Sequence, residues 1–190
     1  MRALVAVFAL GCAVPAAAQE EDLIDYARLF REHAAEVLPG EDDWGRPGEV
    51  LNLPDGTSLW RSGPADSPRY SGTSTVGTAC GFMWALFAID SILQCPEGVP
   101  PDQLATVNLT ADRVLTYWGQ NTYPPRSLAE MQTFMQRDQE EPGERDCAVI
   151  KTGPDRPIDI AQLISGEEFQ AALKEELAKP PHLMVTGRCY

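Results

Sequence analysis

The stretch CGFMWALFAIDSILQCPEGVPPDQL, residues 80–104, decides the fold, because it runs from an apolar segment through a proline-rich turn into a second helical pattern. The apolar run 79–93 is longer than a typical strand and contains no turn residue beyond Gly81, which predicts a largely buried helix. A buried carboxylate needs a partner, so we interpret Asp90 as a structural anchor that bonds a neighbouring helix end, not as a catalytic acid.

Two further core helices are expected after this stretch. Residues 102–121 repeat apolar positions at helical spacing, with Asp102 as the predicted N-cap. Residues 127–138 begin with Ser127 and Glu130 in the spacing of a capping box, which predicts a third and shorter helix. The positions expected to face the core are Leu104, Val107, Ala111, Val114 or Leu115, Trp118, Leu128, Met131, Phe134 and Met135.

The segments before the apolar helix predict one more helix and a hairpin. Residues 22–38 form an amphipathic pattern that a Pro-Gly pair would end. Residues 50–60 alternate around a central Pro-Asp-Gly sequence, which is typical of a hairpin with a tight turn. The glycine-rich residues 72–81 predict a loop into the apolar helix, with Thr78 as its cap. The first helix is expected to bury Leu23, Ala27, Phe30, Ala34 and Val37.

The C-terminal part of the chain predicts a strand, a helix and another strand. Residues 147–153 and 182–189 have the composition of strands, and residues 165–177 begin with Ser165 and Glu168 in capping-box spacing. The expected fold class is therefore mainly α with a minor β element (α+β), in a small disulfide-bonded helical domain. Its helical core is expected at residues 22–38 and 78–137, with a C-terminal β/α extension at residues 143–190.

The first 18 residues have the pattern of a secretory signal peptide. An apolar run follows Arg2, and three alanines ending at Ala18 precede an acidic segment, which places the cleavage site near Ala18. Residues 19–190 are then expected to form a single exported domain, periplasmic or secreted. No apolar run of the sequence approaches the ~20 residues of a membrane-spanning helix, so no membrane span is predicted. The oligomeric state stays open.

The chain is strongly acidic. Its formal net charge is −13, and removal of residues 1–18, which carry only Arg2 as a charged residue, changes this to −14. Nucleic acids and anionic membranes would be repelled, so we predict neither as a partner. The charge favours either simple solubility or a basic protein partner.

Four cysteines remain after cleavage, namely Cys80, Cys95, Cys147 and Cys189. An even number of cysteines in an oxidising compartment is most simply explained by two disulfides. Cysteine metal sites use closely spaced pairs such as C-x-x-C, and the sequence contains none, so we predict no metal site and no cofactor. If residues 80 to 95 form one unbroken helix, its ends lie about 22 Å apart, too far for a direct disulfide.

No catalytic motif stands out in the sequence. The two histidines, His33 and His182, are far apart and have no nucleophile in motif context. The hydrolase, P-loop and metalloprotease motifs are missing from the sequence, so we predict a non-enzymatic protein. Paired-carboxylate hydrolysis depends on spacing in three dimensions, and the alternative of an exported hydrolase that uses acidic residues stays open.

Residues 79–136 resemble the Rap/Tai family of periplasmic immunity proteins of type VI secretion. That family has a signal peptide, an apolar helix opened by a cysteine and carrying an aspartate, and a Cys-x-Pro-x-Gly-Val segment. Two cysteines of the family pattern are missing here, and residues 41–78 and 143–190 have no counterpart. The resemblance lies in Cys80, Asp90, Cys95, Gly98, Val99, Gln103, Leu104, Tyr117 and Asn121.

The resemblance implies both a disulfide pairing and a role. It implies that the middle pair, Cys80 with Cys95, is retained, which leaves Cys147 with Cys189 and would require the helix to stop near Asp90. It also implies a small helical protein that blocks a toxin.

We therefore expect an exported protein that binds a protein partner, an immunity-type inhibitor of a secreted effector. The aromatic residues Tyr117, Trp118 and Tyr123 are predicted interface anchors, because aromatic residues dominate binding hot spots. Ordinary packing at a helix end is the alternative role for these three side chains. The alternative functions are the exported hydrolase and a periplasmic stress or structural protein.

Overall fold

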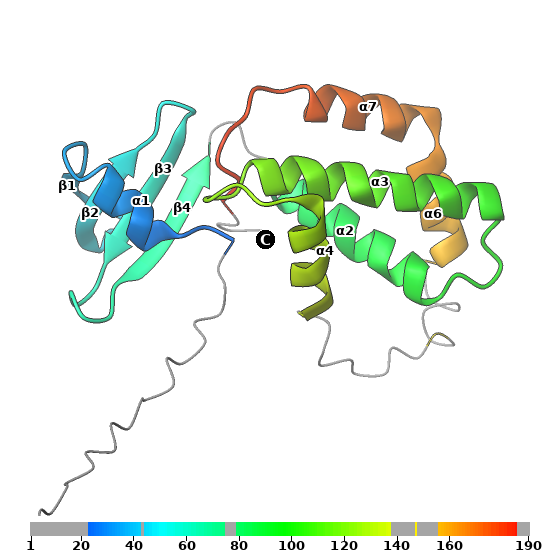
Figure 1. Cartoon of the computed structure of the whole chain (residues 1–190), viewed down its shortest axis with the longest axis horizontal. Helices are drawn as coiled ribbons and strands as arrows, with labels where there is room; N and C mark the ends of the chain where they lie inside the picture. Colours follow the sequence, from blue (N-terminus) through cyan, green and yellow to red (C-terminus); the bar gives the residue numbers. More distant parts are fainter. Residues whose placement is uncertain (1–22, 43, 75–78, 138–146, 148–155, 186–190) are drawn as a thin grey trace, which may run out of the picture.

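The computed structural model describes residues 23–42, 44–74, 79–137, 147 and 156–185. The described part contains six helices and a four-stranded antiparallel sheet, which confirms the α+β class. Figure 1 shows the sheet with one short helix beside it at one end of the molecule and the remaining helices at the other end. Among the described helices, none is both long enough and apolar enough to cross a membrane.

The sheet forms from consecutive strands in the order β1-β2-β3-β4. The predicted hairpin is confirmed, since Leu51 pairs with Leu59 across a turn in which Gly56 adopts a φ of 86°. That left-handed conformation favours glycine and closes the tight turn. The strands are β1 Leu38–Glu41, β2 Pro47–Asn52, β3 Thr57–Ser62 and β4 Arg69–Ser74.

Helix α1, Tyr26–Glu32, is shorter than the predicted helix over residues 22–38. It begins after Asp25, whose carboxylate accepts a hydrogen bond from the backbone N–H of Arg28 at 2.8 Å. The predicted Pro-Gly stop is instead part of β1, which pairs with β2. Strand pairing thus overrides the local helical pattern.

Helix α1 packs on the sheet. Its Leu29 and Phe30 are 2% and 1% exposed and share a core cluster with Leu51 and Leu59. The helical core therefore does not include this segment, in contrast to the expectation from sequence.

The central helices are α2 Ala79–Gln94, α3 Pro101–Gln120 and α4 Leu128–Arg137. The residue that precedes α3 is Pro100, so the prediction of Asp102 as its cap is wrong; Asp102 lies in the first turn. The α4 capping box is confirmed. The Ser127 backbone N–H donates to the Glu130 carboxylate at 2.7 Å, and the Glu130 N–H donates to the Ser127 hydroxyl at 3.3 Å.

The core face predicted for α3 is largely confirmed, because Val107, Ala111, Val114, Leu115 and Trp118 are all buried. Helix α4 contributes Met131, which is fully buried, while its other predicted core positions are only partly buried.

Two helices stand where one was predicted near the C-terminus, α6 Pro157–Ser165 and α7 Glu167–Leu177. The predicted capping box of Ser165 and Glu168 is wrong. Ser165 is the last residue of α6, Gly166 precedes α7, and no side chain caps α7. Helix α6 was missed because its nine residues follow a segment that we expected to be a strand.

The C-terminal segment 182–185 joins the sheet to the helices. Leu183 and Val185 enter the cluster with the sheet, and Met184 enters the cluster of α2, α3 and α4. This alternation is that of a strand, but the segment forms no ladder. Instead the N–H of Leu183 donates to the Asp55 carboxylate at 2.6 Å, and that of Met184 to the Asn121 carbonyl at 2.9 Å. The predicted extension is therefore an integral part of the core.

Several predictions lie outside the described residues. These are the signal peptide over residues 1–18, the cap at Thr78, the strand predicted from residue 148 to 153, and Cys189.

Candidate functional site

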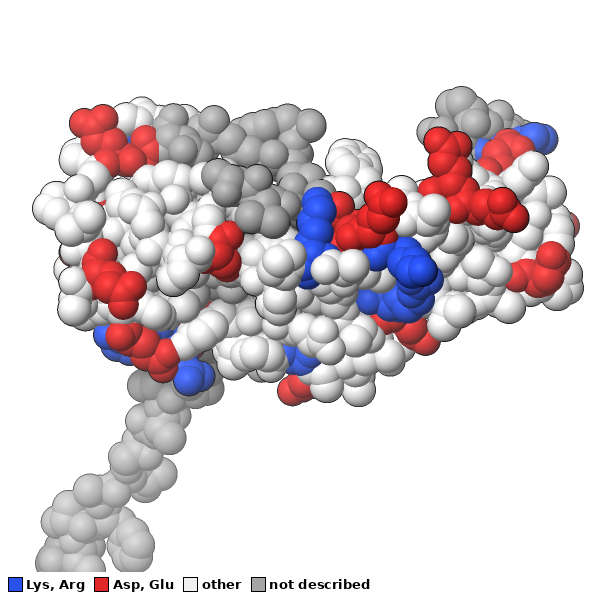
Figure 2. All heavy atoms as spheres, turned by 90° about the horizontal axis from the view of Figure 1, so that it is seen from above, with Lys and Arg blue, Asp and Glu red and all other residues white. Residues whose placement is uncertain are grey.

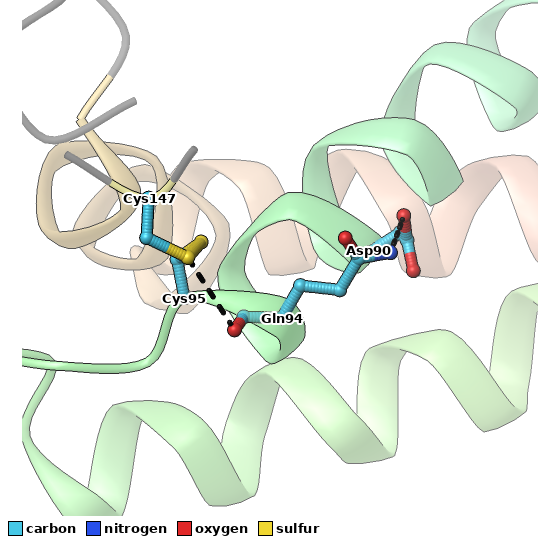
Figure 3. The surroundings of a disulfide bond; sticks show 4 residues. All are labelled: Asp90, Gln94, Cys95 and Cys147. Atoms are coloured by element: carbon cyan, nitrogen blue, oxygen red, sulfur yellow. Dashed lines mark hydrogen bonds between the residues drawn. A yellow bond between two sulfur atoms is a disulfide. The ribbon is translucent and has the colours of Figure 1, made fainter. Parts of the chain in front are cut away.

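A disulfide joins the end of α2 to Cys147. Figure 3 shows the bond between Cys95 and Cys147. Their Cα atoms are 5.7 Å apart. The pairing of Cys80 with Cys95 is therefore wrong, because α2 continues unbroken to Gln94 and holds the two residues at opposite ends. Cys189 and the side chain of Cys80 lie outside the described part.

Asp90 lies on α2, one turn before this disulfide. Its carboxylate accepts a hydrogen bond at 2.7 Å from the side-chain amide of Gln94, in the same helix (Figure 3). Asp90 is half-buried, not enclosed. The prediction of a hydrogen-bonded carboxylate is confirmed, but this bond links successive turns of one helix and does not reach a neighbouring helix.

Two of the three predicted interface anchors lie in the core. Tyr117 and Trp118 are 8% and 3% exposed and belong to the cluster between α2, α3 and α4. Burial and the nearby Glu176 raise the pKa of Tyr117. Their burial favours the alternative role, ordinary packing at the end of α3, over that of interface anchors.

Tyr123 is partly exposed in the loop between α3 and α4, where it contacts α1. Its hydroxyl donates a hydrogen bond to the Glu32 carboxylate, and the Arg28 guanidinium lies 5.4 Å from its ring centroid. Its backbone carbonyl accepts from the N–H of Asp25 at 2.7 Å. Tyr123 therefore fastens α1 to the helical part of the molecule.

An exposed aromatic pair on α2 is the most distinctive surface feature among the described residues. Trp84 is 63% exposed and Phe87 is 42% exposed, and their ring centroids lie 6.3 Å apart in an edge-to-face arrangement. The opposite face of the same helix buries Phe82, Leu86 and Ile89. Helix α2 is thus apolar on both sides, and the expectation that it is largely buried is wrong for this face.

The aromatic face of α2, defined by Trp84 and Phe87, carries little charge. The whole helix contains no Lys or Arg, and Asp90 is its one acidic residue. Elsewhere the charges are spread out, and Figure 2 shows acidic side chains scattered over one side of the molecule around a smaller basic group. An uncharged aromatic face on an acidic molecule can bury apolar area against a partner with little desolvation of charge.

The histidines form no catalytic arrangement in the described part. His33 lies 3.1 Å from the Glu36 carboxylate near the surface. His182 is 4% exposed, and its ring lies against Tyr117 with its Nδ1 atom 3.1 Å from the Pro180 carbonyl. No group of three or more His, Cys, Asp or Glu side chains that could hold a metal occurs among these residues.

Comparison of the chain with protein-family models, with curated proteins and with solved structures found no match. The resemblance to the Rap/Tai family therefore stays a prediction.

Sequence reasoning missed Trp84 and Phe87 because an apolar run with no polar face gives no sign of which side meets the core. The signal that was present is spacing. Phe82, Leu86 and Ile89 recur at intervals of four and three, which accounts for one buried stripe, and the aromatic pair lies off that stripe.

Proposed function

We propose that this chain is an exported, non-enzymatic protein that binds a basic protein partner through the aromatic face of α2. The observation that carries the proposal is the exposure of Trp84 and Phe87 on a helix whose other side is core. Exposed apolar groups of this size forgo stabilisation of about 25 cal/mol for each Å² left in water. Trp is strongly enriched at binding hot spots, whereas scattered exposed leucines are ordinary.

The chemistry of the partner follows from the charge of the chain. A net charge of −13, or −14 after removal of residues 1–18, attracts a basic molecule over distance and speeds its association. The aromatic face would then fill an apolar pocket of that partner, with basic residues around the pocket. The expected partner is a secreted protein with an apolar cleft and a basic rim.

An immunity-type inhibitor of a secreted effector is the form of this function that the sequence resemblance supports. Helix α2 lies within residues 79–136, which carry the resemblance to the Rap/Tai family, so the aromatic face belongs to the same part of the chain. A protein that blocks a toxin needs one strong anchor and no chemistry of its own. The aromatic pair supplies such an anchor.

The test is affinity capture with matched variants. The oxidised protein from residue 19 onward serves as bait in periplasmic and secreted fractions of the producing cells. Trp84→Ser is compared with Leu109→Ser, a control on α3 whose side chain is 60% exposed. We expect one stoichiometric basic partner that the wild type and Leu109→Ser retain and that Trp84→Ser loses, with slower association at high salt.

Retention of the same partner by Trp84→Ser would contradict the proposed site. Capture of no protein from either fraction, together with hydrolysis of cell-wall or glycan substrates, would favour the exported hydrolase. Capture of many unfolded proteins without stoichiometry would favour the stress-protein alternative.

A further inference from the structure

The tip of the β1–β2 hairpin is rigidly built around one buried carboxylate. The side chain of Asp42 is 1% exposed and accepts hydrogen bonds from the backbone N–H groups of Trp44 and Arg46, both at 2.9 Å. It also accepts from Arg46 Nε at 2.6 Å. Burial alone would raise the pKa of Asp42, but the hydrogen bonds from Arg46 and Trp44 outweigh it and lower that pKa. Gly45, at a φ of 71°, completes the turn.

This construction presents an aromatic ring to solvent. Trp44 is 55% exposed, and the Arg46 guanidinium lies 4.6 Å from its ring centroid. The hydrogen bonds of Asp42 hold the backbone at Trp44 and the guanidinium of Arg46 before any ligand arrives, so little backbone entropy is lost on binding. Arg46 binds Asp42 through Nε, and its terminal guanidinium nitrogens can donate to a ligand beside the ring.

The chemistry of the tip excludes several ligand classes. A cation is disfavoured because the Arg46 guanidinium beside the indole ring would repel a second positive charge, and because the Asp42 oxygens are engaged by three donors. The charges of Asp42 and Arg46 cancel, and the sequence of the turn adds the acids Glu41 and Asp43, so an anion would meet net negative charge both here and over the whole chain. A purely apolar partner would find polar, exposed neighbours such as Glu41 around the ring. What remains is a neutral ligand with an apolar face and hydroxyl groups at its edge.

We propose that the hairpin tip formed by Asp42, Trp44 and Arg46 binds a sugar ring of a neutral oligosaccharide. The C–H face of a pyranose stacks on the indole, and its hydroxyl or amide oxygens accept hydrogen bonds from Arg46. This site is separate from the aromatic face of α2, since the hairpin belongs to the sheet end of the molecule (Figure 1). It does not depend on the proposed protein binding.

The experiment is ¹⁹F NMR of the oxidised protein labelled with 5-fluorotryptophan, with chitotriose, cellotriose and maltotriose as probes. The chain has four tryptophans, and each signal is assigned by a Trp→Phe variant. We expect the Trp44 signal alone to shift with at least one sugar, saturating with a dissociation constant of about 1 mM. Arg46→Lys keeps the charge but loses the guanidinium fork, and should weaken binding about tenfold.

The controls separate a site from general stacking. Leu38 is the first residue of β1, the strand that leads into the tip, and its side chain is 58% exposed. Leu38→Ala should therefore leave sugar binding unchanged. No shift of the Trp44 signal with any of the three sugars would overturn the proposal, as would equal shifts of the Trp44 and Trp84 signals. If Trp44→Ala fails to capture the protein partner and no sugar shifts the Trp44 signal of the wild type, the tip belongs to the protein interface. That result would also overturn the proposal of a sugar site.

Discussion

Asn121 holds the C-terminal segment against the end of α3 through both ends of its side chain. Its amide donates to the Tyr117 carbonyl at 2.7 Å, and its carbonyl oxygen accepts from the His182 backbone N–H at 2.8 Å. The residue is 5% exposed, so neither partner could turn to water if the side chain were removed. A sequence resemblance includes this position, but only the structure explains it physically.

We predict that Asn121→Ala destabilises the protein by about 2 kcal/mol, because a buried N–H and a buried carbonyl lose their partner. The control is Asn52→Ala, whose side chain bonds Ser58 at the exposed hairpin and whose loss should cost less than about 0.5 kcal/mol. Urea unfolding followed by circular dichroism measures both. Equal losses would contradict the role assigned to Asn121.

The contact between Tyr123 and Glu32 makes the attachment of α1 sensitive to acid. Hydrogen bonds from the Tyr123 hydroxyl and from Arg28 lower the pKa of Glu32, and the bond to Glu32 raises the pKa of Tyr123. A carboxyl group with a lowered folded-state pKa stabilises the fold above its unfolded pKa of about 4.3. That stabilisation disappears as the pH falls through the lowered folded-state value.

We therefore expect Tyr123→Phe to be less stable than the wild type above about pH 4.5 and to approach it as the pH falls below the folded-state pKa of Glu32. Urea unfolding at a series of pH values tests this, with Glu36→Gln as a control that leaves Tyr123 and Glu32 in place. A difference between Tyr123→Phe and the wild type that persists unchanged into strong acid would show that the tyrosine acts by packing alone.

At the scale of elements, two identical sequence signals have different outcomes. Ser127 and Glu130 form the capping box that their spacing predicts, whereas Ser165 and Glu168 have the same spacing and form none. The difference comes from the preceding chain. Ser165 already ends α6, and its buried hydroxyl has no hydrogen-bond partner among the described residues.

We predict that Ser127→Ala costs about 1 kcal/mol of stability through loss of the cap. Ser165→Ala should be neutral or slightly stabilising, since it removes a buried hydroxyl that has no partner. The two variants serve as controls for each other in a single set of urea unfolding curves. A larger loss for Ser165→Ala than for Ser127→Ala would mean that the Ser165 hydroxyl has a partner in solution.

Most of the helices could be predicted from sequence, because apolar residues at helical spacing mark the buried stripe of each helix. The core positions of α3 followed from helical spacing, and the hairpin from its turn residues. The limits of α1 could not be predicted, since pairing of β1 with β2 decides where the helix stops. Of the candidate site, the apolar helix was foreseen but its exposed face was not, because periodicity does not show which neighbours pack where.

At the scale of the whole molecule, the described core consists of three clusters. One cluster lies under the sheet, one between α2, α3, α4 and α7, and one between α2, α3 and α6, so α2 and α3 belong to both of the last two. The segment 182–185 connects the first two through its alternating side chains. The third contains Ile89 and Ile92 near the end of α2, next to the disulfide at Cys95. The disulfide therefore lies beside the one cluster to which the described segment 182–185 contributes no side chain.

The disulfide between Cys95 and Cys147 should be the largest single contribution among these connections. It closes a loop with a sequence separation of 52 residues, for which the chain-entropy relation gives about 4 kcal/mol. Cys95→Ala, Cys147→Ala and the double variant should lose similar amounts, because either change removes the same bond. Urea unfolding measures the losses, and non-reducing peptide mapping should recover a peptide pair that links Cys95 to Cys147. Additive losses, or a peptide that links Cys95 to Cys80, would contradict this bond. The peptide would also support the prediction that the apolar helix stops near Asp90.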